Sequence, residues 1–313
     1  MFELVFLGTS ASAPSVHRGL PSQVVKYNEH RFLVDCGEGT QRQIMHSGLG
    51  FKKLNRLLIT HGHLDHILGI GGLVSTYLRW EAIDQLEIYA GQSALERIGD
   101  LLFKVVIRGV TPPFPIQLIP IKPGVFIEQD DFSISAFPVV HRGPDCYGFA
   151  FEEKGRRPFL ADKAEKLNLP QGPWRRDLVA GKPVTLPDGS QVTPEMVLGE
   201  FQPGTRLVVV GDAGQTDDLT EVCKNADGLV IEGTYLEEEK EMARQFSHLT
   251  VKEVAQLALR ANVKHVYLTH ISRRYREKDV EKEAIEIFPN TTIVHDFDHF
   301  QIKHDNQGSN SKN

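Results

Sequence analysis

The chain has 313 residues, of which 41% are hydrophobic and 24% are charged, as in ordinary globular proteins. This length suits one large domain or two small ones, and its apolar runs are too short to span a bilayer. Residues 1–14 lack the basic segment of a signal peptide, so we expect a cytoplasmic protein outside any membrane. The formal charge of −6 argues weakly against a nucleic-acid partner.

Short strand-like runs alternate with helical patterns along the chain. Runs rich in Val, Ile, Leu and Phe predict strands at 3–8, 22–27, 31–36, 56–60, 86–90, 116–120, 132–140, 147–153, 206–212, 227–233 and 265–270. Helical spacing predicts helices at 39–48 and 250–261. Polar side chains stand at or just after the ends of five strands: Asp35, His61, His141, Asp212 and His270. Ligands of α/β sheets bind at the carboxyl ends of strands, so we expect an α/β fold with its site there.

Residues 154–200 interrupt this alternation with a segment rich in Pro, Gly and charge, which cannot form a core strand. Within it, residues 154–182 carry eight Lys or Arg against three Asp or Glu, a local charge of +5 that leaves about −11 elsewhere. The pattern predicts an arm inserted into one domain of residues 1–303, although a merely solvated loop is the alternative. The polar residues 304–313 are expected to form a disordered tail.

The densest group of reactive side chains is HGHLDH at residues 61–66. His61 and His63 can face one cation at a strand end, while Asp65 and His66, one turn further on, can face a second. Imidazole and carboxylate are the usual zinc ligands where thiolates are absent, and the three cysteines here are widely spaced without a CxxC pair. A polar loop with scattered histidines fits this spacing poorly. Two cations need more ligands, and three other strand ends offer them: His141, Asp212 and His270.

HGHLDH with the later His, GD and TH elements resembles the metallo-β-lactamase fold, which implies an αβ/βα sandwich with a binuclear zinc site. Within this fold, FLGTSASAP, VDCGEGTQ, VIEGTY, FSHLT and THISRRY resemble ribonuclease Z, the endonuclease that trims transfer-RNA 3′ trailers, over residues 2–297. The segment LNLPQGPWRRDLVAGKPV resembles the tRNA-binding exosite of that family. The implied architecture is therefore the sandwich with an inserted projecting arm, and the implied substrate is precursor tRNA.

The resemblance also implies a set of metal ligands for two Zn²⁺ ions per subunit, although Mn²⁺ or Co²⁺ could serve the same donors. One ion would be held by His61, His63 and His141, the other by Asp65, His66 and His270, and Asp212 would bridge them.

Catalytic roles follow from the same resemblance. Asp65 would be the general base, and His248, oriented by Glu232, would protonate the leaving 3′ oxygen. The alternative for His248 is an exposed histidine at a helix start. Cleavage would leave a 3′-hydroxyl on the tRNA and a 5′-phosphate on the trailer. Ser272 and Arg274 would contact the scissile phosphate.

Basic side chains of the arm would meet tRNA phosphates: Arg156, Arg157, Lys163, Lys166, Arg175, Arg176 and Lys182. Gly172 and Pro173 would stiffen its tip, and Trp174 would either stack on RNA or pack within the arm. Family members are often homodimers in which the arm of one subunit clamps tRNA for the active site of the other.

Some residues depart from the family pattern, and other functions stay open. Leu64 replaces Gly, Ala213 replaces Thr, and residues 13–19 keep Arg18 but lack the Lys and Asn of the PxKxRN loop, which leaves discrimination against CCA ends undecided. A small-molecule phosphodiesterase or related hydrolase on the same fold would share every ligand but would have no use for the basic arm. A non-enzymatic RNA-binding protein would not keep the full ligand set.

Overall fold

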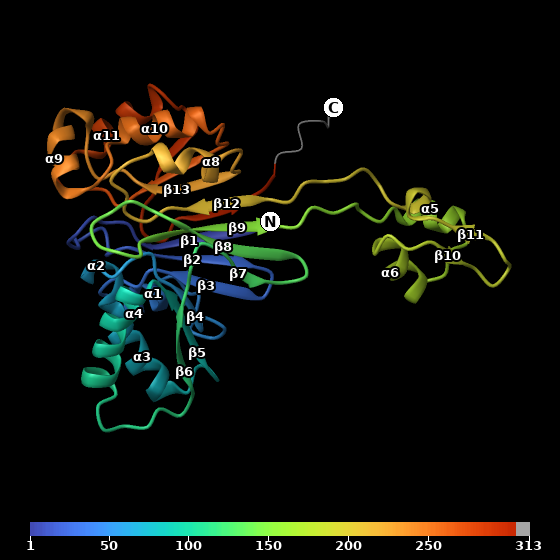
Figure 1. Ribbon diagram of the computed structural model, residues 1–313, viewed down its shortest axis with the longest axis horizontal. Helices are drawn as coiled ribbons and strands as arrows, with labels where there is room; N and C mark the ends of the chain where they lie inside the picture. Colours follow the sequence, from blue (N-terminus) through green and yellow to red (C-terminus); the bar gives the residue numbers. More distant parts are fainter. Residues whose placement is uncertain (305–313) are drawn as a thin grey trace. The chain divides into compact units, whose positions relative to one another are not determined.

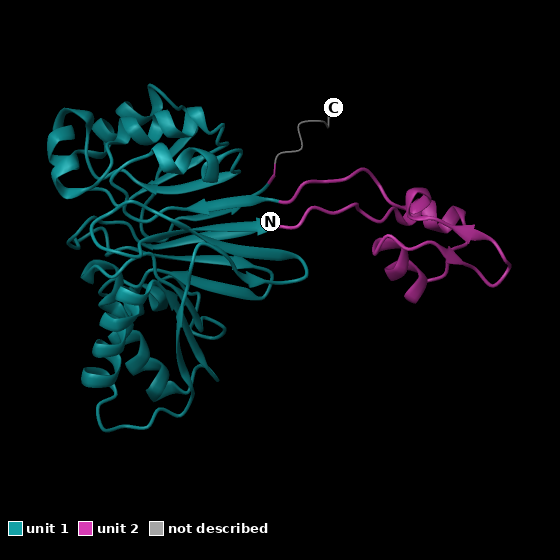
Figure 2. Cartoon of the chain, viewed as in Figure 1, with its two compact units in different colours: residues 1–152, 205–303 teal, residues 153–204, 304–313 magenta. Residues whose placement is uncertain are grey.

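The computed structural model describes residues 1–304, so nearly all of the predicted tail lies outside the described residues. Contacts divide the chain into two compact units, shown in different colours in Figure 2. The main unit consists of residues 1–152 and 205–303, and the second unit consists of residues 153–204 together with residue 304. The predicted insertion at 154–200 lies within this second unit.

Two seven-stranded mixed sheets form the main unit. The first has the order β16-β1-β2-β3-β4-β5-β6. Its strands are β16 (His299–Ile302), β1 (Phe2–Gly8), β2 (Ser22–Tyr27), β3 (His30–Val34), β4 (Arg56–Leu58), β5 (Leu86–Ala90) and β6 (Ile116–Pro120). Neighbours are antiparallel from β16 to β3 and parallel from β3 to β6.

The second sheet repeats this design with the order β15-β14-β13-β12-β9-β8-β7. Its strands are β15 (Thr291–Ile293), β14 (Val266–Thr269), β13 (Gly228–Glu232), β12 (Arg206–Val209), β9 (Tyr147–Glu153), β8 (Phe132–Pro138) and β7 (Gly124–Glu128). The strands from β12 to β15 are parallel, whereas β9 pairs with β12 in the antiparallel sense.

Helices cover the outer face of each sheet (Figure 1). The first sheet packs against α1 (Thr40–His46), α3 (Gly69–Trp80) and α4 (Gln92–Gly99), and the second against α8 (Thr220–Cys223), α10 (Val251–Arg260) and α11 (Glu277–Ile285). Between the sheets lies an aromatic core that includes Phe2, Phe32, Phe132, Phe149 and Phe151, all fully buried. The expected αβ/βα sandwich is confirmed, because each sheet buries both of its faces.

Every strand predicted from the sequence is present; β2, β5, β6 and β9 have the predicted bounds, and the others differ by at most three residues at an end. The strands β7, β15 and β16 and the helices α3, α4, α8 and α11 are among the elements that were not predicted. None of the described helices is long and apolar enough to cross a membrane.

The second unit has a small apolar core of its own, and Trp174 packs against it. Its elements are α5 (Ala161–Lys166), α6 (Pro173–Val179), β10 (Val184–Thr185), β11 (Gln191–Val192) and α7 (Pro194–Val197). Gly172 has φ +124° and precedes Pro173, the first residue of α6, so this Gly-Pro pair starts a helix. The insertion stands where a hairpin turn would join β9 to β12, since Glu152 pairs with Arg206. The sheet is therefore continuous despite the insertion.

Candidate active site

Strand ends of both sheets bring the predicted ligands together. His61, His63, His141 and Asp212 form one group, and Asp65, His66 and His270 form a second. Within each group, one ligand atom of every residue lies within 4.8 Å of the others. His61 follows β4 and His270 follows β14, while Asp65 and His66 lie in the short helix α2 (Leu64–Ile67). All seven predicted ligands thus gather at one edge of the sandwich.

Asp212, after β12, stands between the two groups. Its Oδ2 lies 3.8 Å from Nε2 of both His61 and His141, and its Oδ1 lies 3.5 Å from Nε2 of His66 and 3.4 Å from Nε2 of His270. Because its two oxygens face different groups, this carboxylate is placed to bridge two cations.

Three buried nitrogen atoms of the site lack hydrogen-bond partners in the part of the chain that the structure describes and could bind cations. Nε2 of His61, His66 and His270 has no hydrogen-bond partner among the described residues. A buried polar atom without a partner costs about 1–3 kcal/mol, which a bound cation would offset. Burial lowers the pKa of His61 and His141 and lowers that of His63 to about 4, so these rings keep the lone pair that a metal needs. Burial also opposes protonation of His66, yet the Asp212 and Asp35 carboxylates raise its pKa, so a cation would take the place of a proton on that ring. The residues therefore fit divalent cations.

On the first sheet, the Asp35 carboxylate orients two of these rings. Its Oδ2 accepts a hydrogen bond from Nδ1 of His66 at 2.8 Å. It also accepts the hydroxyl proton of Thr60 at 2.9 Å, and Thr60 Oγ1 lies 3.0 Å from Nδ1 of His61. A carboxylate only accepts, so each ring donates through Nδ1 and presents Nε2 to the site.

On the second sheet, Glu232 at the end of β13 has the same role. Its Oε1 lies 2.9 Å from Nδ1 of His248, and its Oε2 accepts a hydrogen bond from Thr234. The Thr234 hydroxyl in turn lies 2.8 Å from Nδ1 of His270. Two buried carboxylates, one at the end of each parallel set of strands, therefore position four histidines.

Tight backbone contacts hold Asp35 against α2. The amide of Cys36 donates to His66 O at 2.8 Å, and the amide of Gly69 donates to Cys36 O at 2.9 Å. A Cβ on Gly69 would lie 2.0 Å from Gly37 O, so only glycine allows this approach.

Charged neighbours shift the pKa values of Asp65 and His248 in opposite directions. Burial favours the neutral form of Asp65, but the nearby rings of His270 and His66 hold its pKa below the usual range, so it is ionised. Burial also opposes protonation of His248, yet the Glu232 carboxylate raises the pKa of His248 to about 9. Near neutral pH the two groups therefore carry opposite charges, Asp65 as a carboxylate and His248 as an imidazolium.

Comparisons with known proteins decide the family. A model described as "Anti-Pycsar protein Apyc1" matches residues 2–168, and one described as "Beta-lactamase superfamily domain" matches residues 182–271. Ribonuclease Z of Bradyrhizobium diazoefficiens is 43% identical over 302 residues, which cover 96% of this chain and all of that protein. Ribonuclease Z of Archaeoglobus fulgidus is 38% identical over 97% of this chain and 99% of its own. The chain belongs to the ribonuclease Z family. These relatives match both sheets and the insertion, whereas each family model matches only a part of the chain. The chain is accordingly a hydrolase of the ribonuclease class.

Solved structures agree with this fold. Human tRNase Z, short form, has a TM-score of 0.68 at 23% identity, covering 96% of this chain and 100% of its own. The metallo-beta-lactamase fold protein YhfI from Bacillus subtilis has a TM-score of 0.69 at 17% identity with the same coverage. Both similarities support the metallo-β-lactamase fold of this ribonuclease Z family member.

Other residues predicted from the ribonuclease Z motifs lie beside the ligand groups or in the insertion. Arg274 pairs with Glu239, with Nη2 and Oε1 3.8 Å apart, and Ser272 Oγ accepts a hydrogen bond from the amide of Arg274. The Arg18 guanidinium donates to Thr9 Oγ1 at 2.7 Å and pairs with Glu277 at 3.1 Å. Arg18 therefore anchors the base of the loop that precedes it.

In the insertion, the predicted RNA-binding cations divide into two kinds. Arg157 donates to Gly199 O at 2.9 Å, and Arg175 donates to Leu169 O and Pro170 O and lies over Phe159, so both stabilise the insertion itself. The side chains exposed to solvent are Arg156, Lys163, Lys166, Arg176 and Lys182.

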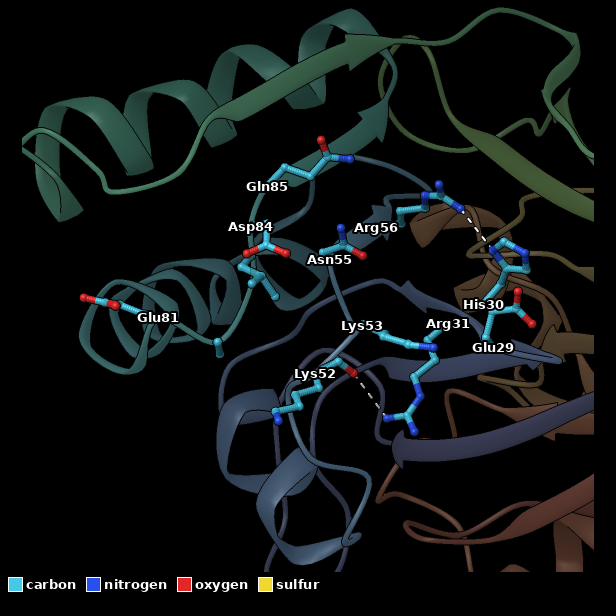
Figure 3. A pocket seen from close by; sticks show the side chains of 12 residues that line it. Glu29, His30, Arg31, Lys52, Lys53, Asn55, Arg56, Glu81, Asp84 and Gln85 are labelled. Atoms are coloured by element: carbon cyan, nitrogen blue, oxygen red, sulfur yellow. Dashed lines mark hydrogen bonds between the residues drawn. The ribbon is translucent and has the colours of Figure 1, made fainter.

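A separate pocket of about 590 Å³ is lined by the loops before β3, β4 and β5 (Figure 3). Its arginines already have partners: Arg31 donates to Leu49 O at 2.7 Å, and Arg56 pairs with Glu87 at 3.0 Å and lies 3.4 Å from His30. No predicted ligand lines this pocket. This pocket is therefore separate from the histidine and aspartate groups.

From the sequence, Asp35 was predicted only as a strand-end residue without a role, and Thr60 and Thr234 were not predicted. The adjacency of Thr60 to His61 in ITHGH was the one available signal.

Proposed function

We propose that this chain is a zinc-dependent endoribonuclease that removes 3′ trailers from precursor tRNA, leaving a 3′-hydroxyl on the tRNA and a 5′-phosphate on the trailer. The observation that carries the proposal is the joining of two ligand groups through Asp212, with the His248–Glu232 pair beside them. The ribonuclease Z relatives over nearly the full chain support tRNA as the substrate.

Zinc fits the His and Asp donors, and two such cations, when bound, lower the pKa of water and neutralise charge on the phosphoryl oxygens. His61, His63 and His141 would hold one ion, Asp65, His66 and His270 the other, and Asp212 both.

Protein side chains would then move the protons. Ionised Asp65, with 17% of its side chain exposed, accepts a proton from the attacking water. His248 keeps Nε2 free, because Glu232 holds its Nδ1, and donates a proton from Nε2 to the leaving 3′ oxygen. Glu232 fixes the orientation of that ring and stabilises its charged form.

The insertion is proposed as the tRNA-binding exosite, with its exposed cations on backbone phosphates. Gly172 and Pro173 shape it by starting α6. Ser272 and Arg274 would reach the scissile phosphate, for which Arg274 must leave Glu239. A homodimer and a cytoplasmic location stay predictions, and light scattering of the purified protein tests the dimer.

The test is cleavage of a labelled precursor tRNA with a 3′ trailer by the zinc-loaded protein, beside an Asp65→Ala variant. A second variant replaces residues 154–204 with Asn-Gly, a two-residue turn that lets β9 and β12 pair as an ordinary hairpin. A CCA-ended precursor is run in parallel to show whether the enzyme discriminates against it.

A single cut near the discriminator base, lost with Asp65→Ala and weakened by the turn replacement, is the expected result. Hydrolysis of bis(p-nitrophenyl) phosphate without any cut in tRNA would instead assign a small-molecule phosphodiesterase.

A further inference from the structure

Two threonine hydroxyls lie between the buried carboxylates and the histidines of different ligand groups. Thr60 connects Asp35 to His61, and Thr234 connects Glu232 to His270. Both threonines are buried, with 1% and 3% of their surface exposed. Neither residue belongs to a ligand group, and neither belongs to the proposed proton-transfer pair.

The direction of each hydrogen bond follows from the number of protons and lone pairs on the groups involved. A hydroxyl carries one proton, and an ionised carboxylate can only accept, so each threonine donates to its carboxylate. The oxygen lone pairs that remain can only accept, so Nδ1 of His61 and of His270 must carry the proton. Each ring is thereby fixed in the tautomer whose Nε2 lone pair faces the ligand group, and these are two of the three Nε2 atoms without a partner.

Each carboxylate acts on two histidines at once. Asp35 holds His66 of the second group directly and His61 of the first group through Thr60. Glu232 holds His248 directly and His270 through Thr234. Each threonine hydroxyl, by contrast, contacts a single ring, so replacing one threonine changes the support of one histidine only.

We propose that Thr60 and Thr234 are positioning residues that set the affinities of the two cation positions separately. Thr60 acts on the position formed by His61, His63, His141 and Asp212, and Thr234 acts on the position formed by Asp65, His66 and His270. This inference rests on the two-cation centre of the proposed function.

Replacement by valine removes the hydroxyl and nearly keeps the shape of the side chain. The carboxylates keep other donors, since Asp35 still accepts from the amide of Thr60 at 2.8 Å and Glu232 from the amide of Ala213 at 2.8 Å. Serine keeps the hydroxyl and serves as the conservative variant that should restore binding.

The experiment is a titration of the full metal-free chain with Co²⁺ in competition with a chelator, followed by the visible absorption of the bound ion. His141→Ala marks the binding step of the first position, and His270→Ala marks that of the second. Thr60→Val should weaken the step that His141→Ala weakens, and Thr234→Val the step that His270→Ala weakens, each about 10- to 100-fold. Thr60→Ser and Thr234→Ser should bind within about threefold of the wild type.

Circular dichroism of each metal-free variant checks its fold, and Thr60→Ala and Thr234→Ala provide a second pair that should give the same shifts if a valine variant unfolds. Two Co²⁺ bound by every threonine variant with wild-type affinity would overturn the inference and leave the nuclease proposal intact. Equal loss at both positions from either valine would also overturn it. Failure of the wild-type chain to bind Co²⁺ or Zn²⁺ would overturn the two-cation centre itself.

Discussion

Oε1 of Glu232 lies 2.9 Å from Nδ1 of His248, and both side chains are buried beside Asp212. The same carboxylate oxygen accepts the amide of Ala213 at 2.8 Å, which fixes it against the loop that carries Asp212. The position of His248, the proposed proton donor, therefore depends on that of Asp212, the proposed bridging ligand.

The rate of cleavage should depend on the protonation of His248. Its pKa is raised to about 9, so the ring is charged at neutral pH and activity should fall as pH rises through this value. Two bound cations oppose protonation, which places the fall at or below pH 9. Glu232→Gln removes the charge that favours the imidazolium, so the cleavage rate should begin to fall at a lower pH than in the wild type. Above that pH the rate should be about 10²- to 10⁴-fold lower.

Single-turnover rates of the zinc-loaded protein across the pH range measure this effect, with Glu238→Gln at an exposed position as the matched control. A profile that does not move with Glu232→Gln would contradict the assigned pairing.

Asp212→Ala should weaken metal binding at both cation positions, because the two carboxylate oxygens face different groups. Elemental analysis should find fewer than two metal ions per chain, and cleavage should fall more than about 100-fold. Asp217→Ala, at an exposed acid five residues on, is the control and should keep both ions. Full metal occupancy in Asp212→Ala would exclude the bridging role.

Exposed cations of the insertion should act on tRNA binding alone. Lys163→Ala, Lys166→Ala and Arg176→Ala are each expected to raise KM for precursor tRNA, leave kcat unchanged and reduce the salt dependence of binding by about one unit. Hydrolysis of a small diester should not change. Lys122→Ala, an exposed lysine of the main unit, is the control, and an equal effect there would remove the special role of the insertion.

Gly69→Ala should destabilise the main unit by about 1–3 kcal/mol, because the new Cβ would meet the carbonyl of Gly37 and must move backbone. The displaced contact also holds Asp35 near His66, so metal affinity should fall as well. Gly72→Ala in the same helix is the control, since its Cβ would meet only the end of the Gln41 side chain. Urea denaturation of both variants, with and without chelator, measures the difference, and equal stability would contradict the clash.

The ligand groups were predictable because four donors, His61, His141, Asp212 and His270, follow apolar strands, and the other three lie within five residues of His61 in HGHLDH. The helix α3 was not predicted, since GIGGLVSTYLRW contains three glycines that lower helix propensity although the helix packs well. Thr60 and Thr234 could not be predicted, because their roles depend on Asp35 and His270, which lie 25 and 36 residues away. Similarly, composition gave the charge of the insertion but not that Arg157 and Arg175 are used within it.

The first ligand group extends from His61 to Asp212, and the second needs both Asp65 and His270. No fragment that ends before β14 contains the second group. During synthesis, a growing chain would therefore carry the insertion and its exposed cations well before it could complete the proposed cleavage centre. A chain that stops before His270 would carry the cations proposed to bind RNA without the full set of ligands proposed for cleavage, so the order of the sequence would delay hydrolysis until the second sheet has formed.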